Sequence, residues 1–234
     1  MKKIDNGDAF ILNPKLISLV SNWQDAGSPV QEKFNWSARK PVWESTFPNH
    51  EEFIEGLPSA IGRGDVRLVC ESTQNSIIEK FLTVMIWGYG DRGYGPFRVS
   101  KMLGQEGTIH VLTQAHEFCQ NGNPKAAYKF LALNRIYMLG PSYGSKFITF
   151  CVPRDVGAPI YDSLISMWIS EFASKEFQNV GTSSERWNLS TYSRYWDWVK
   201  IHSEYLGCFP DEIEFVLFRD AELRFSKASN WAGK

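Results

Sequence analysis

Apolar residues recur at helical spacing through much of this chain, and this pattern limits the folds open to it. In the segment 76–87 they fall three and four residues apart, as on the buried face of a helix. Gly, Pro or Ser/Asn-rich stretches separate further segments with helical patterns. We expect those helices at residues 96–103, 107–119, 125–138, 143–152, 159–172, 191–206 and 211–223, with a loop at 173–190. The sequence therefore predicts an all-α fold.

The composition is that of a soluble globular protein. The chain has 234 residues, 43% hydrophobic and 22% charged, which suits one domain with a sizeable core. No run of about 18 apolar residues could cross a membrane, and the polar first residues do not resemble a signal peptide. The four cysteines are widely spaced, as is typical of reduced thiols. We expect a cytoplasmic protein without membrane contact, and we expect it to be a monomer.

The segment 139–162 contains the residues that point most directly to chemistry. Gly140 and Gly144 allow a tight backbone turn and a close approach to another surface. Lys146 follows among mostly apolar residues, where desolvation would favour the neutral, nucleophilic amine. Asp162 follows a Gly/Pro-rich loop, so we expect it in the first turn of a helix, where the helix dipole favours a carboxylate. A phosphate-binding turn, an amine and a carboxylate together suggest chemistry on DNA.

Each of these residues also has a purely structural explanation. A single lysine on a helix is usually solvated, and an aspartate at such a place is usually a helix cap. The net charge of −1 gives no general attraction to nucleic acid. A local phosphate site made of backbone N–H groups nevertheless needs no net positive charge. The combined pattern is therefore more informative than any one of its parts.

The glycine-rich segment 88–95 is a second candidate site. From Gly88 to Gly93 it matches G-x-G-x-x-G, the dinucleotide-binding fingerprint, but a helical pattern precedes it and the expected acidic residue does not follow. A plain turn and a loop that enters a DNA groove both remain open. In the second alternative, large side chains would fill the gap left by an extruded base. The candidates are Tyr89, Arg92 and Tyr94.

Other chemistries have little support in the sequence. His110, His116 and Cys119 lie close together in the chain, but they lack the paired spacing of a zinc site and a fourth ligand. Neither a Walker phosphate loop nor a G-x-S-x-G nucleophile motif occurs. We therefore expect no metal and no cofactor.

These motifs resemble the helix-hairpin-helix DNA glycosylases, in which a hairpin is followed by a Gly/Pro-rich loop and an aspartate. Residues 140–144 look like the hairpin, and residues 157–162 look like the loop. Within that superfamily the chain is most similar to the 8-oxoguanine glycosylase branch, whose lysine nucleophile Lys146 would match. The block 81–103 looks like the helix-loop-helix that supplies wedge residues in these enzymes. The resemblance covers residues 76–172.

The resemblance implies an all-α fold with two helical lobes and an active site in the cleft between them. It implies a single glycosylase domain over residues 1–234, in which 1–75 and 173–234 complete the second lobe and the base pocket. The hairpin register stays open. If Gly140 is the last hairpin glycine, Lys146 falls about one turn later than in the eukaryotic-type enzymes, and if Gly144 is, the lysine aligns directly. The amino-terminal β-domain of those enzymes is missing, so the identity of the excised base stays open.

The resemblance also implies a mechanism on double-stranded DNA that contains a modified base. The base would be flipped out and its N-glycosidic bond cleaved without a cofactor. Asp162 would stabilise positive charge on the sugar or steer the nucleophile, and Lys146 would attack C1′ and form a Schiff base. Backbone N–H groups of the hairpin would hold a phosphate, and the wedge loop would fill the vacated stack. The implied DNA contacts are Gly140, Pro141, Ser142, Tyr143, Gly144, Tyr89, Arg92 and Tyr94.

Two substrates fit this mechanism. Compact bacterial proteins with this fold are associated with phage defence, where the excised base is a glucosylated hydroxymethylcytosine, and we favour this base over 8-oxoguanine. The alternatives from other classes are a non-catalytic helix-hairpin-helix module that binds DNA or a partner protein, and a helical scaffold with no role on DNA. Only a glycosylase requires Lys146 and Asp162 to face the same cleft.

Overall fold

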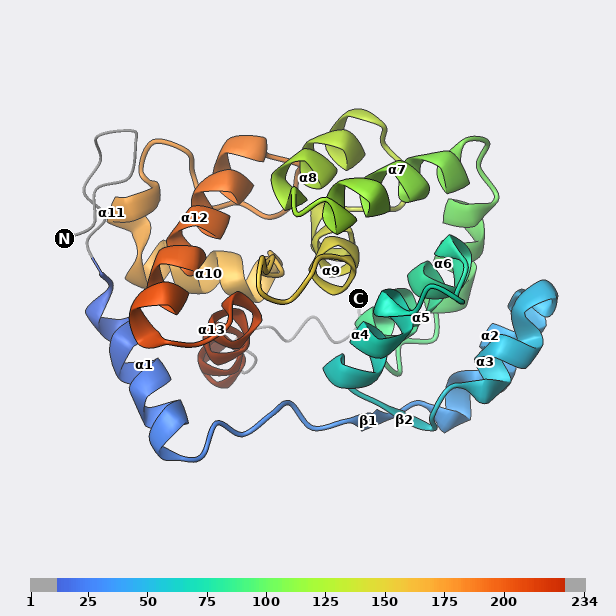
Figure 1. Cartoon of the computed structure of the whole chain (residues 1–234), viewed down its shortest axis with the longest axis horizontal. Helices are drawn as coiled ribbons and strands as arrows, with labels where there is room; N and C mark the ends of the chain where they lie inside the picture. Colours follow the sequence, from blue (N-terminus) through green and yellow to red (C-terminus); the bar gives the residue numbers. More distant parts are fainter. Residues whose placement is uncertain (1–11, 226–234) are drawn as a thin grey trace. The chain divides into compact units, whose positions relative to one another are not determined.

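The computed structural model describes residues 12–225, which contain the helices α1 to α13 and one short two-stranded ribbon (Figure 1). The predicted all-α class is confirmed. The chain divides into two compact units. We call residues 30–156 the lysine unit, and the described residues 12–29 and 157–225 the aspartate unit. The boundary lies inside the segment 76–172 that the resemblance marked as the core.

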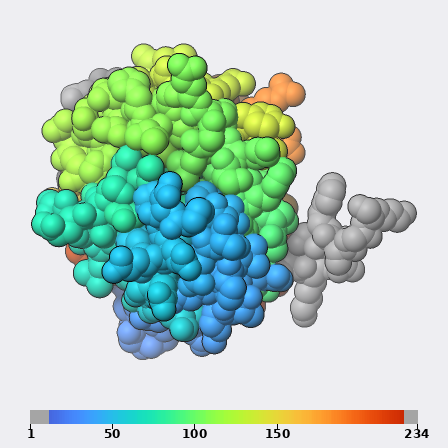
Figure 2. Space-filling view, turned by 90° about the vertical axis from the view of Figure 1, so that its right-hand side faces the viewer, coloured from blue at the N-terminus to red at the C-terminus, as the bar shows by residue number. Residues whose placement is uncertain are grey.

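The lysine unit is built mainly of helices. Its elements are β1 (Phe34–Asn35), α2 (Lys40–Thr46), α3 (Glu51–Gly56), β2 (Ala60–Ile61), α4 (Arg63–Glu71), α5 (Ile77–Tyr89), α6 (Gly95–Leu103), α7 (Thr108–Gln120), α8 (Pro124–Leu133) and α9 (Pro141–Cys151), with short 3₁₀ turns at Ser37–Arg39 and Pro48–His50. The two strands pair antiparallel. Helix α2 also contacts α6, and the blue and green segments adjoin in Figure 2.

Helix α9 is the central helix of the lysine unit, because it contacts α4, α5, α7 and α8. Phe147 and Ile148 are completely buried, and burial of each such side chain contributes about 1.5–3 kcal/mol. The Phe147 ring meets Phe81 of α5 edge-on, with 5.7 Å between the ring centroids. The apolar residues around Lys146 therefore form the core of the unit, as their pattern indicated.

Helix α5 begins with a capping box, in which the Ser76 hydroxyl accepts from Glu79 N and the Glu79 carboxylate accepts from Ser76 N. This arrangement confirms the helix expected over residues 76–87, although the helix continues to Tyr89. Helix α8 is shorter than expected, because residues 134–138 turn back toward α9.

The aspartate unit is helical as well. Its elements are α1 (Pro14–Asp25), α10 (Ser163–Phe172), α11 (Ser174–Phe177), α12 (Leu189–Leu206) and α13 (Pro210–Phe225). Helix α13 contacts α1, α10 and α12, so it forms the centre of this unit. Helix α11 interrupts the segment that the sequence predicted to be a loop. Among the described residues of either unit, no helix is long and apolar enough to span a membrane.

Candidate active site

The hairpin before α9 lies earlier than the sequence suggested. The turn occupies residues 134–140, with Met138 at a φ of 70°, and α9 begins at Pro141. Proline is favoured at the first helical position because its missing N–H has no partner there anyway. Gly140 therefore ends the turn, whereas Gly144 lies inside the helix and is buried.

This geometry changes which backbone groups could hold a phosphate. Pro141 has no N–H, and the N–H of Gly144 donates to the Gly140 carbonyl at 2.9 Å. Neither position therefore offers an N–H group to a phosphate, and the phosphate contact expected at residues 140–144 stays a prediction for the other backbone donors. The backbone donors at this helix start are those of Ser142 and Tyr143, which precede the helical hydrogen-bond ladder.

Gln105 fixes the hairpin in place. Its side-chain oxygen accepts from Tyr137 N at 2.8 Å, and its side-chain nitrogen donates to the Tyr137 carbonyl at 3.2 Å. The pair of bonds joins the turn after α6 to the hairpin. Sequence reasoning missed Gln105, because a glutamine between two helical segments carries no signal of a contact 32 residues away.

Lys146 lies in the second turn of α9 and is partly buried. Its Nζ donates to the Ser142 hydroxyl at 3.1 Å and lies 5.4 Å from the centre of the Tyr143 ring. A Cβ added at Gly88 would be 3.2 Å from Lys146 Cδ and 3.2 Å from Tyr143 Cε1. The absence of a side chain at Gly88 therefore makes room for the lysine.

Three tyrosines connect this lysine to the predicted wedge segment. The Tyr143 ring stacks on Tyr89 with 4.3 Å between centroids, and Tyr89 meets Tyr94 edge-on at 5.6 Å. Burial raises the pKa of both Tyr143 and Tyr89, so both phenols are neutral at physiological pH. We call Tyr89, Tyr94 and Tyr143 the tyrosine cluster.

The three wedge candidates differ in their exposure to solvent. Tyr89 belongs to α5 and is 2% exposed, so the structure assigns it to the support of Tyr143 and not to contact with DNA. Arg92 and Tyr94 lie in the turn between α5 and α6 and are exposed. Burial lowers the pKa of Arg92, but hydrogen bonding to Tyr94 and the neighbouring phenols raises it by more, so the net pKa is raised. The turn thus presents one cation and one ring.

Asp162 lies immediately before α10, whereas the sequence predicted it inside the first turn of a helix that begins at residue 159. Its Oδ1 accepts from Leu164 N at 3.1 Å and from Ile165 N at 3.2 Å. Asp162 is therefore the N-cap of α10, and the helix begins at Ser163 instead of residue 159 because the cap residue itself is extended. The carboxylate is only partly buried, so the cap does not remove it from solvent.

Lys146 and Asp162 belong to different units. Each is described within its own unit, and their juxtaposition across one cleft stays a prediction.

The histidines and the cysteine that invited a metal hypothesis have other surroundings. His110 is exposed, and Cys119 is completely buried. His116 Nε2 lies 3.3 Å from Nζ of Lys80, a buried lysine that the sequence did not single out. Burial, and then the Lys80 charge, lower the pKa of His116. Within residues 12–225 no group of three or more His, Cys, Asp or Glu side chains could hold a metal ion.

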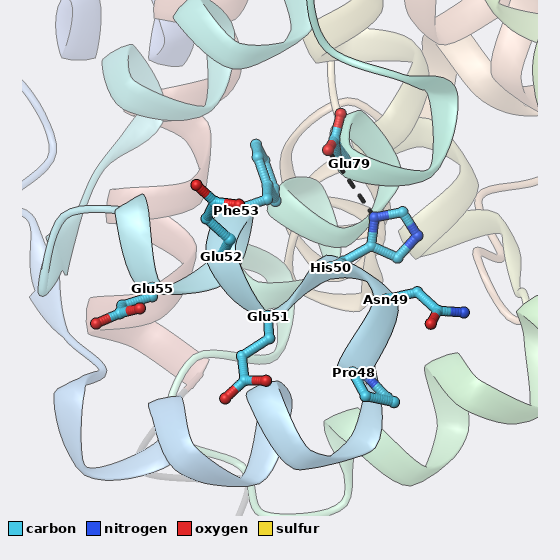
Figure 3. A pocket seen from close by; sticks show the side chains of 8 residues that line it. All are labelled: Pro48, Asn49, His50, Glu51, Glu52, Phe53, Glu55 and Glu79. Carbon is cyan, nitrogen blue, oxygen red and sulfur yellow. Dashed lines mark ion pairs between the residues drawn. The ribbon is translucent and has the colours of Figure 1, made fainter.

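A pocket of about 570 Å³ lies in the lysine unit, away from Lys146 (Figure 3). Its lining residues are Pro48, Asn49, His50, Glu51, Glu52, Phe53, Glu55 and Glu79. His50 Nδ1 points at Glu79 Oε1 across 3.9 Å, and the other glutamates would repel a phosphate backbone. Glu79 and Gly88 are nine residues apart on α5, or about 13 Å along the helix. This pocket is not part of the lysine site.

The all-α fold is the one that the resemblance to DNA glycosylases implied, and comparison with known families agrees. Residues 27–218 match the model of a family described as "Putative 8-oxoguanine DNA glycosylase OGG-like protein". The chain therefore belongs to this OGG-like family. The searches for similar curated proteins and for similar solved structures found no match.

Gly88→Ala tests the close packing at Lys146. Alanine stabilises a helix by about 0.4–1 kcal/mol relative to glycine, but overpacking costs about 1–3 kcal/mol. The Tyr143 ring is held by its stack on Tyr89, so we expect crowding to outweigh the gain and the free energy of unfolding to fall. Chemical denaturation measures this change.

Gly64→Ala is the matched control, because a Cβ at this helical glycine of α4 meets nothing within 4 Å. It should stabilise the protein. Equal stabilisation by both substitutions would show that the lysine and the tyrosine have room to move.

Proposed function

We propose that this protein is a DNA glycosylase that uses Lys146 as an amine nucleophile. The observation that carries the proposal is the position of Lys146 on a buried helix, directly behind a hairpin, in a member of the OGG-like family. The partner is duplex DNA with a modified base. A non-catalytic DNA-binding module would also need the hairpin. It would not need the room that the missing side chain of Gly88 leaves for Lys146.

The N-terminus of α9 supports the binding step of this proposal. The N–H groups of Ser142 and Tyr143 carry the positive end of the helix dipole and suit a phosphate oxygen. A phosphate held there would lie within two helical turns of Lys146. The net charge of −1 is compatible with this local site, because backbone donors supply the attraction.

The turn between α5 and α6 supports base flipping. Extrusion of a base costs a few kcal/mol of stacking and pairing, and a side chain that fills the gap offsets part of the cost. Arg92 and Tyr94 are exposed in this turn, Tyr94 packs edge-on against the buried Tyr89, and Arg92 hydrogen-bonds with Tyr94. A supported ring or guanidinium can replace base stacking with less loss of side-chain entropy.

The chemical step follows from the two ionisable groups. Lys146 in its amine form attacks C1′ of the flipped nucleotide, the C1′–N bond to the base breaks, and the base leaves with the bonding electrons. The Nζ that is now bonded to C1′ gives up one proton, which neutralises the departing base. The C1′–O4′ bond then breaks, O4′ takes a proton from water, and a protonated Schiff base between Nζ and C1′ remains. The Asp162 carboxylate would stabilise the positive charge that develops on the sugar.

Two bases are the substrate candidates. The family description names 8-oxoguanine, and this base is the first to test. The glucosylated hydroxymethylcytosine that the sequence resemblance favoured, together with a role in phage defence, is the second. Duplexes with either base, and an unmodified duplex, form the substrate panel. Alkali treatment reveals abasic sites, and strand breaks without alkali reveal lyase activity.

Lys146→Ala tests the nucleophile. Borohydride reduces the Schiff base to a stable amine, so wild-type protein should become covalently attached to substrate DNA, and the Lys146→Ala variant should not. Denaturing gel electrophoresis measures the attached fraction. Lys129→Ala, at an exposed lysine of α8, is the control and should keep full trapping. Full base release by Lys146→Ala would mean that water is the nucleophile.

Asp162→Asn tests the carboxylate separately from the cap. Asparagine already caps α1, α8 and α12 through Asn13, Asn123 and Asn188, so this change should keep α10 and the thermal stability intact. The lost negative charge should slow single-turnover base release by about 100-fold or more, with DNA affinity nearly unchanged. A variant that loses stability and keeps its rate would show that Asp162 is only a cap.

Arg92→Ala and Tyr94→Ala test the wedge. Base release from an intact duplex should slow by about tenfold or more, because a few kcal/mol of flipping cost is no longer offset. Release from a substrate whose target base is already unpaired should change little. Tyr205→Ala, at an exposed tyrosine of α12, is the control for loss of a surface ring. Equal loss on both substrates would assign the turn to packing.

A further inference from the structure

Helix α12 holds the loop that leads to Asp162. The indole N–H of Trp196 donates to the Gly157 carbonyl at 2.7 Å. One turn earlier, the Tyr192 hydroxyl reaches the Pro159 carbonyl at 3.5 Å. Positions 192, 195 and 196 are spaced i, i+3 and i+4, so these side chains share one face of the helix. We call Tyr192, Tyr195 and Trp196 the aromatic clamp.

Tyr195 differs from the other two members of the clamp. Its ring packs on Tyr161, the residue before Asp162, with 4.9 Å between centroids. The side chain is completely buried, yet its hydroxyl has no hydrogen-bond partner within the described residues of the chain. A buried hydroxyl without a partner lowers stability, whereas a phenylalanine of the same shape would not. A tyrosine whose buried hydroxyl has no hydrogen-bond partner calls for an explanation other than packing of its ring.

The groups around Tyr195 determine whether its hydroxyl can donate a hydrogen bond. Burial raises the pKa of Tyr195 well above its ordinary value, and the carboxylates of Glu214 and Asp162 and the phenols of Tyr161 and Tyr192 raise it further. The phenol therefore keeps its proton. A protonated phenol within electrostatic range of two carboxylates can act toward them as a hydrogen-bond donor.

We propose that Tyr195 is a positioning residue, whose hydroxyl donates a hydrogen bond to the Asp162 carboxylate when DNA is bound. This inference rests on the proposed glycosylase function. Both cap bonds to Asp162 end on Oδ1 and come from α10. A donor from α12 would also set the plane of the carboxylate and direct it at the sugar. The unpaired hydroxyl of the free protein then acquires its partner in the complex, as expected of a group arranged in advance for the transition state.

Tyr195→Phe tests this role, because it removes the hydroxyl and keeps the ring. The single-turnover rate of base release, on the duplex that wild-type protein cleaves fastest, should fall by about tenfold to a hundredfold, since small misplacements of a reacting group have effects of this size. The dissociation constant for the same duplex should stay within about twofold of wild type, because no bond to DNA is removed. The melting temperature should stay the same or rise.

Tyr161→Phe is the matched control in the same aromatic group. The Tyr161 hydroxyl donates to the Thr182 carbonyl at 2.5 Å, so its removal should lower the melting temperature by roughly 2–4 °C and leave the rate unchanged. Tyr195→Phe should therefore lower the rate without loss of stability, and Tyr161→Phe should lower the stability without loss of rate.

The outcomes separate the two proposals. A wild-type protein that releases no base from any duplex of the panel overturns the proposed function and this inference with it. An active wild type with an unchanged rate in Tyr195→Phe overturns only the inference. A Tyr195→Phe variant that melts lower and keeps its rate also overturns it, because the hydroxyl would then serve stability, as a donor to Glu214 would.

Discussion

The burial of α9 is the constraint on which the lysine site depends. Four helices surround it, and the residues from Phe147 to its end are buried, so the helix cannot rotate or slide without exposing core residues. The hydrogen bond from Lys146 to Ser142 contributes only about 1 kcal/mol, whereas burial of Phe147 and Ile148 contributes several times that amount. The packing of the core therefore sets the position of the lysine, and its own polar contacts only orient it.

The tyrosine cluster connects α9 to the neighbouring turn through ring contacts. Tyr143 projects from α9 and stacks on Tyr89, which in turn supports Tyr94 at the start of α6. The candidate nucleophile and the candidate wedge thus share one set of stacked rings within a single unit. The turn begins with Gly90 at a φ of 61°, a conformation that glycine adopts without the strain that a side chain would add. Flipping and attack would then act on one rigid frame.

Asp162 shows how one side chain can serve both fold and chemistry. As the cap of α10 its carboxylate accepts hydrogen bonds from two backbone N–H groups at the helix start. The capping explanation is therefore correct. It does not compete with the catalytic proposal, because the carboxylate that caps the helix is only partly buried. The chain caps three other helices with asparagine, so the charge of an aspartate is not needed for the cap alone.

The sequence by itself determined the helical class and the order of the helices from α5 onward except α11, and it offered a helix cap as the structural explanation of Asp162, because periodicity, proline and cap residues act over a few neighbouring positions. It misplaced the hairpin, since Gly140 and Gly144 are equally good turn residues and only the packing of α9 shows that one lies in the helix. It also treated Tyr89 as an exposed wedge candidate, because burial of an aromatic residue near a helix end depends on what the rest of the chain places against it. The tertiary structure decided the contacts of Gly88 and the support of Asp162 by α12. These contacts join residues about 30 to 60 positions apart, and no local pattern in a chain encodes such distances.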